Sequence, residues 1–230
     1  MADVKVVASL MCADWLNLGK DIEELEKAGI DGFHLDIMDG NFVPNFSMNF
    51  WMVDAIRKHT SLPLDVHLMV TEPIRFIKKL TDLKVDLITV HAESSVYLDN
   101  VVREIKGNGV KAGVALTLET TMTTVRTKLE ENFDDVDMLL FMTSRPGYMG
   151  QKFREDVIAK LERTREMLKG NGFNPDIMAD GGIGEHAIPL LAKAGVNVFV
   201  GGTNGLFLKE STFKENLAKM KNLAAANYTW

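Results

Sequence analysis

Eight short apolar runs, rich in Val, Ile and Leu, alternate with longer amphipathic stretches along this chain of 230 residues. Near-continuous apolar runs are typical of strands that are covered on both faces, as in a parallel sheet. The alternation favours an α/β fold, with one (β/α)8 TIM barrel domain over residues 1–230. An open doubly wound sheet is the main alternative, but no GxGxxG motif follows the first run. The runs cover residues 4–10, 32–37, 64–70, 85–91, 110–117, 136–143, 175–180 and 197–203.

Helix signals occupy the stretches between these runs. Three stretches have apolar side chains at helical spacing and end at or near a glycine, a common helix terminator. The phrase Lys-Ala-Gly, followed by Ile-Asp at 27–31 and by Val-Asn at 193–197, indicates the same joint between helix and strand twice. The three predicted helices cover residues 18–29, 153–172 and 184–195.

Composition argues against several classes of protein. Lys and Arg number 26 against 32 Asp and Glu, and no basic run stands out, so we expect no nucleic-acid partner. No apolar stretch reaches the length of a membrane span, so we expect no membrane association. The first residues lack the pattern of a signal peptide, and Cys12 is the single cysteine. Both features fit a cytoplasmic protein in a reducing compartment.

Four side chains with metal-binding chemistry lie where three of the apolar runs end. Side chains two apart on a strand share a face, and catalytic groups of a barrel lie at the carboxyl ends of its strands. We therefore expect the four to converge inside the barrel. Two imidazoles and two carboxylates suit Zn²⁺, with Mn²⁺, Fe²⁺ or Co²⁺ as alternatives. The motifs HLD at 34–36, DVH at 65–67 and MADGG at 178–182 supply them: His34, Asp36, His67 and Asp180.

Each of these residues also has a plainer interpretation. A single histidine on a strand is more often structural than a ligand, and an aspartate at a strand end is often a helix cap. The conjunction favours a metal site, because two carboxylates buried together need a compensating cation. We expect His59 and His186 to be solvated, and His91 to be structural or to support the site. Flexible core filling that also dries the site is expected of Met38, Met69 and Met142.

Glycine-rich segments follow the last three apolar runs. Glycines at strand-to-helix turns let backbone N–H groups approach an anion. A tight turn would explain any one segment alone, but three on neighbouring strands favour a phosphate site. The segments are RPGYMGQ at 145–151, DGGIG at 180–184 and GGTNG at 201–205.

Seven motifs follow one another along the chain: ASLMCAD at 8–14, FHLDIMDGNFVPN at 33–45, PLDVHLMV at 63–70, VHAE at 90–93, PGYMGQKF at 146–153, DGGI at 180–183 and VGGTNGLF at 200–207. In order and spacing, they resemble the ribulose-phosphate 3-epimerase family. The SLMC and GLF pieces look more like its allulose-6-phosphate 3-epimerase branch. The resemblance implies a barrel of the ribulose-phosphate-binding type, an isomerase, a divalent metal ion that is usually zinc, and a homo-oligomer, either a dimer or a hexamer.

The resemblance also implies roles for individual residues. The metal ligands would be His34, Asp36, His67 and Asp180, and Asp36 and Asp180 would exchange protons with the substrate from opposite faces. Ser9 and the two histidines would lie against the sugar. The family's usual Asn-Pro-Gly-Phe-Gly-Gly loop is RPGYMG here, so Arg145 and Met149 leave substrate choice open. The phosphate would be bound by Gly147, Tyr148, Met149, Gly150, Gly181, Gly182, Gly202 and Thr203.

These implications lead to a reaction hypothesis. The chain would interconvert D-ribulose 5-phosphate and D-xylulose 5-phosphate by two-base proton transfer at C3, through a metal-stabilised enediolate. The alternative is 3-epimerisation between D-allulose 6-phosphate and D-fructose 6-phosphate. A phosphosugar aldolase or lyase is less favoured, because the strands offer only Lys5 and Lys111 for a Schiff base, both early in their runs. A non-catalytic phosphosugar-binding barrel would not need the acid/base pair.

Overall fold

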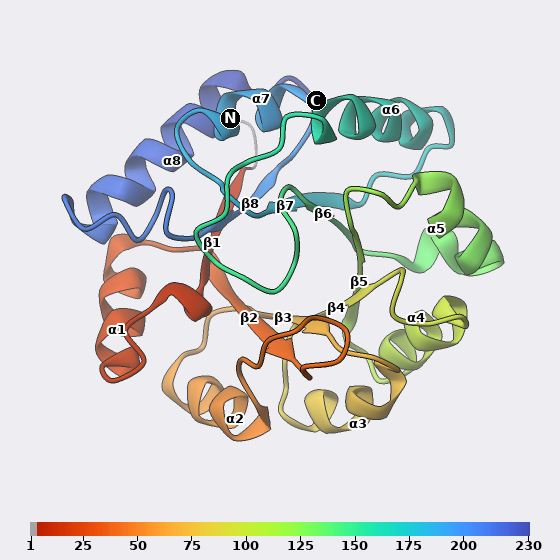
Figure 1. Cartoon of the computed structure of the whole chain (residues 1–230), viewed down its shortest axis with the longest axis horizontal. Coiled ribbons are helices and arrows are strands. Elements are labelled where there is room, and N and C mark those ends of the chain that lie inside the picture. Colours follow the sequence, from red (N-terminus) through yellow and green to blue (C-terminus); the bar gives the residue numbers. More distant parts are fainter. Residues whose placement is uncertain (1–3) are drawn as a thin grey trace.

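A computed structural model of the chain describes residues 4–230, apart from the side chains of Glu130 and Glu131. Eight parallel strands follow one another in sequence order and close into a barrel, in which β1 pairs with β8 (Figure 1). An open sheet would leave these two strands as edges, so closure confirms the (β/α)8 barrel. The strands are β1 (Lys5–Ser9), β2 (Gly32–Met38), β3 (Leu64–Met69), β4 (Leu87–His91), β5 (Lys111–Leu116), β6 (Met138–Met142), β7 (Asp176–Asp180) and β8 (Val198–Gly201).

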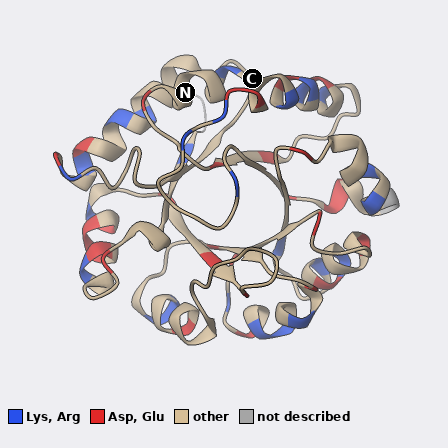
Figure 2. Ribbon diagram, viewed as in Figure 1, with Lys and Arg blue, Asp and Glu red and all other residues tan. Residues whose placement is uncertain are grey.

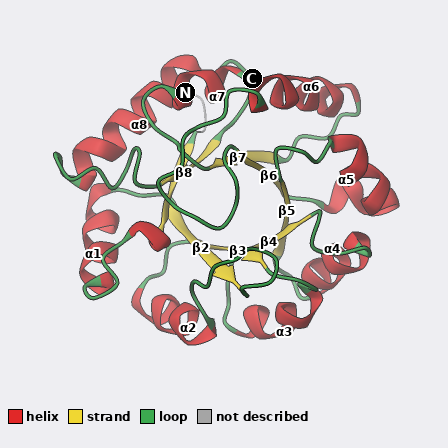
Figure 3. Cartoon of the chain, in the orientation of Figure 1, coloured by secondary structure: helices red, strands yellow, loops and turns green. Residues whose placement is uncertain are grey.

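Helices form an outer ring around the strands, as Figure 3 shows. Within residues 4–230, none of them has the length and apolar character needed to cross a bilayer. The α-helices are α1 (Leu18–Ala28), α2 (Phe50–His59), α3 (Ile74–Asp82), α4 (Leu98–Gly107), α5 (Met122–Leu129), α6 (Val157–Gly170), α7 (Ala187–Lys193) and α8 (Phe213–Asn227), and two 3₁₀ turns are η1 (Leu10–Cys12) and η2 (Glu130–Asp135).

The predicted helix ends are more accurate than the predicted helix starts. Helix α1 stops at Ala28, and Gly29 takes the left-handed conformation with φ of 88°. Helices α6 and α7 begin later than expected, at Val157 and Ala187. Residues 153–156 and 184–186 belong instead to the loops at the carboxyl end of the barrel. The backbone N–H of Arg154, for example, donates to the Thr143 carbonyl at 2.9 Å, which holds that segment against the end of β6.

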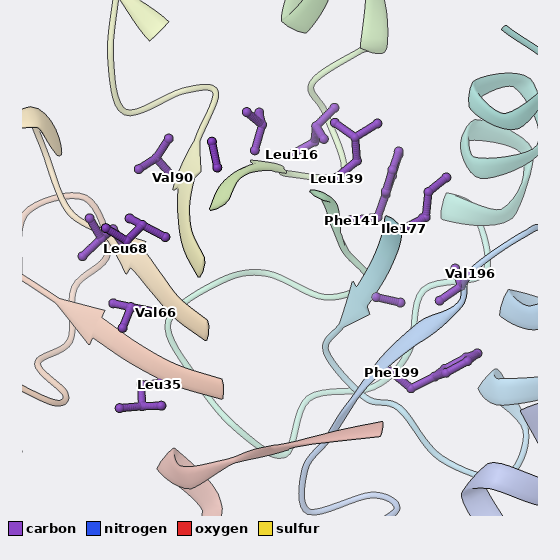
Figure 4. Close-up of a cluster of buried hydrophobic side chains, with 14 of the residues drawn as sticks. Leu35, Val66, Leu68, Val90, Leu116, Leu139, Phe141, Ile177, Val196 and Phe199 are labelled. Carbon is purple, nitrogen blue, oxygen red and sulfur yellow. The ribbon is translucent and has the colours of Figure 1, made fainter. Parts of the chain in front are cut away.

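Alternation along the strands divides the core into two layers. Outward-facing residues such as Leu35, Val66 and Phe199 pack between the strands and the helices (Figure 4). A second apolar cluster fills the barrel interior and includes Leu140 and Val198. On the inward face of β2 and β3 lie His34, Asp36, Asp65 and His67, and Met38 and Met69 follow them at the strand ends, so this part of the lining is largely polar.

The amino end of the barrel repeats one arrangement four times. Before each even-numbered strand, a buried Ile or Val precedes an Asp or Asn. The side chain of that residue accepts a hydrogen bond from a backbone N–H at the start of the preceding odd-numbered strand. The Lys-Ala-Gly phrase marks two of the four copies, at Asp31 and Asn197. The bonds are Val6 N to Asp31 at 2.7 Å, Leu64 N to Asp86 at 2.8 Å, Ala112 N to Asp137 at 2.8 Å and Ile177 N to Asn197 at 2.7 Å.

Candidate active site

Strands β2, β3 and β7 bring the four ligand-type side chains together at the carboxyl end of the barrel. One ligand atom from each of His34, Asp36, His67 and Asp180 lies within 4.8 Å of the corresponding atoms of the others. Asp36 and His67 are direct partners in the register of β2 with β3. The convergence predicted from strand parity is therefore present.

One ring nitrogen of His34 lacks a hydrogen-bond partner. Its Nδ1 lies 2.6 Å from Oδ2 of Asp65, whereas its Nε2 is buried and has no hydrogen-bond partner among the described residues. Leaving a buried polar atom unsatisfied is costly. A divalent cation would satisfy this nitrogen, and two imidazoles with two carboxylates form a donor set that suits Zn²⁺. The residues present therefore fit the metal that the family resemblance implies.

Asp36 lies at the centre of the local hydrogen-bond network. Its Oδ1 is 3.1 Å from Nδ1 of His67, and its Oδ2 accepts a 3.1 Å bond from the Ser9 hydroxyl. Oδ1 is also 3.4 Å from Nε2 of His34. Atoms from three strands thus hold one carboxylate in place, which is what a positioned acid or base requires.

The two carboxylates have opposite pKa shifts. Burial acts to raise the pKa of Asp36, but His34 and His67 outweigh it and hold the pKa well below its usual range. Burial raises the pKa of Asp180 above its usual value, and the nearby Asp36 charge adds to this effect. Without a cation, Asp36 is thus the ionised partner and Asp180 is the carboxyl group that more readily keeps a proton.

The two imidazoles also differ. Burial opposes the charged form of His34, yet Asp65 and Asp36 raise its pKa well above 6.5. Burial lowers the pKa of His67. Both rings are completely buried and do not line the pocket above them. The two rings therefore lie beneath the lining of the pocket, next to Asp36 and Asp180.

A pocket opens over Asp36 and Asp180, and Ser9 lies in its wall. The loop at residues 144–153 crosses the barrel mouth in front of it (Figure 1). Two bonds tie this loop to the loop after β2: Asn45 Nδ2 donates to the Gly147 carbonyl at 2.8 Å, and the Tyr148 hydroxyl donates to the Pro44 carbonyl at 2.8 Å. All the residues expected at the phosphate line this pocket, namely Gly147, Tyr148, Met149, Gly150, Gly181, Gly182, Gly202 and Thr203.

Close packing explains the glycine pair after β7. Gly181 and Gly182 have φ values of 114° and 67°, a region that other residues rarely adopt. A Cβ on Gly182 would lie 2.5 Å from the backbone nitrogen of Phe153, in the loop after β6. A Cβ on Gly181 would collide with the Ser144 side chain. The glycines therefore let the two loops meet and keep their backbones open to the pocket.

The other residues considered from the sequence lie outside the group of four converging side chains. Lys5 and Lys111 start β1 and β5, at the far end of the barrel, and no described lysine lines the pocket. The described lining of the pocket therefore offers no lysine amine for a Schiff base. His59 and His186 are both exposed, as expected. Cys12 lies at the pocket rim, where burial raises the pKa of its thiol to about 11.

Charge is distributed differently between the site and the outer surface. Figure 2 shows Lys and Arg interleaved with Asp and Glu along the outer helices. Among the described residues, Arg145 is the one basic side chain that lines the pocket. An anionic substrate would therefore depend mainly on backbone N–H groups and on this arginine.

The sequence alone assigns no firm role to three polar residues of the site. Strand parity places Asp65 on the correct face but gives it no partner, and it contacts His34. His91, for which two roles are open, lies 2.9 Å from His67. Glu93 has no predicted role, although it lies beside His91 in the VHAE motif and contacts its ring at 3.1 Å. For Asp65, the available sequence signal is its spacing of two residues from His67 on β3, which places both side chains on one face.

Comparison with known proteins places these features in a family context. A family model described as the ribulose-phosphate 3 epimerase family matches residues 5–207. Over 202 residues, the chain is 41% identical to a ribulose-phosphate 3-epimerase of Bacillus subtilis, covering 87% of this chain and 91% of the relative. Over 204 residues, it is 38% identical to the chloroplastic ribulose-5-phosphate-3-epimerase of Arabidopsis thaliana, covering 88% and 71%.

Solved structures with low sequence identity share the fold. A structure of KGPDC from Streptococcus mutans has a TM-score of 0.74 at 12% identity and covers 98% of this chain and 99% of its own. The 3-hexulose-6-phosphate synthase of Salmonella typhimurium has a TM-score of 0.67 at 18% identity, with coverages of 97% and 100%. At these identities the similarity concerns the barrel alone.

Proposed function

The chain belongs to the ribulose-phosphate 3-epimerase family of isomerases, and on that premise we propose that it interconverts D-ribulose 5-phosphate and D-xylulose 5-phosphate. The observation that carries the proposal is the convergence of Asp36 and Asp180 beside two buried imidazoles, beneath a pocket lined by glycine-rich loops. Epimerisation beside a ketone needs two proton-transfer groups and stabilisation of negative charge, and this arrangement offers both.

His34, Asp36, His67 and Asp180 would hold one divalent cation. We propose Zn²⁺ for this donor set, with Mn²⁺, Fe²⁺ or Co²⁺ as alternatives. When bound, the cation supplies a Lewis acid that stabilises the charge developing on the substrate oxygens. The unpartnered Nε2 of His34 supports its placement.

Asp36 and Asp180 would be the proton-transfer pair. Inversion at C3 requires a proton to leave one face of the carbon and another to reach the opposite face. The two carboxylates lie on β2 and β7, which are not neighbours in the barrel. One would act as base toward C3 while the other, protonated, returns a proton from the far side. The opposite pKa shifts of the pair support such a division in the metal-free site.

Substrate orientation would come from the loops after β6, β7 and β8. Backbone N–H groups of the glycine-rich segments would bind the phosphate, and Ser9 would lie against the sugar while it holds Asp36. Phosphate binding at a distance from C3 supplies binding energy that orients the reacting carbon. Family membership also supports a homo-oligomer, a dimer or a hexamer, which the mass of the protein in solution would test.

A hexulose phosphate is the second candidate substrate. Of the two pieces that resemble the allulose-6-phosphate branch, SLMC contributes Met11 and Cys12 to the pocket wall, whereas none of the GLF residues lines the pocket. Met149 also lines the pocket, where the family's usual loop has glycine. Met11, Cys12 and Met149 would change the pocket volume available to a sugar with one more carbon than a pentulose.

Steady-state rates on both phosphorylated ketoses, with metal content measured on the same sample, test the proposal. We expect the larger kcat/KM on ribulose 5-phosphate, and incorporation of deuterium at C3 when the reaction runs in D₂O. Faster turnover of allulose 6-phosphate would favour the second candidate. Absence of turnover on either sugar by metal-loaded protein would refute the proposal, and product without label would argue against exchangeable bases.

A further inference from the structure

Both buried imidazoles of the site are backed by a carboxylate, but at different distances. Nδ1 of His34 meets Asp65 directly, at 2.6 Å. Nε2 of His67 instead meets Nε2 of His91 at 2.9 Å, and Nδ1 of His91 meets Oε2 of Glu93 at 3.1 Å. His67 therefore reaches its carboxylate through a second imidazole.

The intervening ring is held firmly in place. His91 and His67 are both completely buried, and their ring centroids lie 4.9 Å apart at an angle of 28°. The ring of Phe42 packs against His91 with a centroid distance of 4.8 Å. A bond between two ring nitrogens needs one N–H and one lone pair. The tautomer of His91 therefore constrains whether Nε2 of His67 donates or accepts in this contact.

Glu93 provides an acceptor at the end of this hydrogen-bond chain, which runs from His67 through His91. Its Oε1 already accepts two bonds from Thr117, at 3.0 Å from the backbone N–H and 2.9 Å from the hydroxyl. Burial acts to raise the pKa of Glu93, but hydrogen bonds from His91 and Thr120 lower it to about 2. The ionised carboxylate can only accept, so Nδ1 of His91 must donate to it.

We infer that His91 and Glu93 are positioning residues, which fix His67 in the tautomer that presents Nδ1 to the metal. This inference rests on the proposed function, because it takes His67 as a ligand. A nitrogen that coordinates a metal carries no proton, so Nε2 of His67 must carry it and donate to Nε2 of His91. Nδ1–H of His91 then donates to Glu93, and every group in the chain is satisfied.

Two consequences follow for the metal centre. His34 would coordinate through Nε2, with its Nδ1–H bonded to Asp65, whereas His67 would coordinate through Nδ1. A carboxylate behind a metal-bound histidine commonly orients the ring and raises its basicity. Here the effect of Glu93 on His67 is transmitted through His91, so a residue with no contact to the four ligands should change metal affinity.

Replacement of Glu93 by Gln reverses the direction of the hydrogen bonds that run from His67 through His91 to residue 93, with little change in side-chain shape. The two donors of Thr117 require an oxygen at the position of Oε1, which turns the amide NH₂ toward His91. Nδ1 of His91 must then accept, and its proton moves to Nε2. That N–H donates to Nε2 of His67 and leaves the remaining proton of His67 on Nδ1, the atom that the metal needs.

The test uses the whole protein, labelled with ¹⁵N-histidine and loaded with Zn²⁺. Long-range ¹H–¹⁵N spectra identify the protonated nitrogen of each ring, and with five histidines in the chain the signals can be assigned by single substitutions. In the wild type we expect protons on Nε2 of His67 and on Nδ1 of both His91 and His34. For Glu93→Gln, competition with a chelator should show a Kd for Zn²⁺ raised about 10–100-fold.

Glu155→Gln is the matched control. Glu155 contacts His186 at 2.8 Å in an exposed histidine–glutamate pair outside the site, so this change should leave the Kd for Zn²⁺ unaltered. His91→Gln replaces the ring by an amide whose oxygen can accept from His67 without help from Glu93. In that background, Glu93→Gln should have little further effect on the Kd, because coupled residues are not additive.

The outcomes separate the two proposals. If the wild type binds no Zn²⁺ or does not epimerise, the proposed function fails. If it does both, but Glu93→Gln binds Zn²⁺ as tightly as the wild type, only the present inference falls. A spectrum of the loaded wild type with the His67 proton on Nδ1 would overturn the inference in the same way.

Discussion

At the amino end of the barrel, Asp31, Asp86 and Asp137 each accept a hydrogen bond from a strand N–H and each pair with a lysine or arginine. The pairs are Lys221 with Asp31 at 2.9 Å, Arg57 with Asp86 at 3.0 Å and Lys106 with Asp137 at 2.8 Å. At the carboxyl end, Asp36 and Asp180 lie close together. Neither pairs with a lysine or arginine within residues 4–230. The same side chain thus meets two different environments in one barrel.

The difference separates stability from function. The amino-end carboxylates are partly exposed, and their charge and acceptor oxygens are satisfied by the protein itself. Burial of uncompensated carboxylates is costly, so a fold keeps them where they serve a site or where a cation completes them. Substitution at the amino end should therefore affect the free energy of unfolding, and substitution at the carboxyl end should affect turnover.

The largest expected effect is on turnover at the carboxyl end. Asp36→Asn and Asp180→Asn each remove one of the two proposed proton-transfer groups, and each should lower kcat by about 10²–10⁴-fold. Asp137→Asn is the matched change at the amino end, where Asn197 already fills the equivalent place in the fourth copy. Its kcat should stay near that of the wild type. Steady-state kinetics at saturating metal measure kcat for the three variants. If Asp36→Asn and Asp180→Asn both retain substantial turnover, the carboxyl-end aspartates do not have the proposed role.

Removal of the metal should abolish turnover and also lower stability. A ligand that binds only the folded state at 100 times its Kd contributes about 2.7 kcal/mol. Calorimetry with and without a chelator should therefore show a lower Tm for the metal-free protein. Chelation should lower the Tm of Asp137→Asn by as much as it lowers that of the wild type, because residue 137 lies at the amino end, away from the proposed metal site. An unchanged Tm, with full activity after chelation, would contradict a metal at the carboxyl end.

Asp137→Ala should reduce stability and leave catalysis intact. The change leaves the N–H of Ala112 and the ammonium group of Lys106 without their partner. The loss of hydrogen bonds to a charged group suggests a decrease of about 1.5–3 kcal/mol in the free energy of unfolding. Urea unfolding measures it, with Asp137→Asn expected to lose less. If Asp137→Ala had wild-type stability and a reduced kcat, the assignment of stability to the amino end and turnover to the carboxyl end would be wrong.

The smallest expected effect is the pH dependence of metal affinity. Although burial opposes it, Asp65 and Asp36 raise the pKa of His34 well above 6.5 in the metal-free site, so a proton competes with the cation for Nε2. The apparent affinity for Zn²⁺ should rise about tenfold per pH unit below that pKa and level off above it. In the metal-free protein, this raised pKa stabilises the fold at low pH, and the contribution is lost as pH rises through it. An affinity that falls with rising pH would show that no ligand competes with a proton.

Local patterns are sufficient to predict the barrel and the four converging side chains. Apolar runs mark strands, and alternation within a run places His34 and Asp36 on one face, so neither prediction needs long-range information. The pairing of His34 with Asp65, and of His67 with His91, depends on the register between strands. That register is set by closure of the whole barrel, which no single segment encodes.

Helix starts are harder to predict for a related reason. The segments before α6 and α7 run directly into helical patterns, so the sequence does not mark where each helix begins. A tertiary contact holds the first of them outside the helix, as the bond from Arg154 to Thr143 shows. The Lys-Ala-Gly phrase reveals two of the four copies of the repeat at the amino end. At Asp86 and Asp137 the preceding residues differ from this phrase, and only the apolar–Asp pair remains.

Anomalous diffraction from crystals of the Zn²⁺-loaded protein tests the central claim most directly. We expect one strong peak at about 2.0–2.2 Å from Nε2 of His34, Nδ1 of His67 and carboxylate oxygens of Asp36 and Asp180. A fully active protein without a peak among these four side chains, or with its metal bound elsewhere, would contradict it.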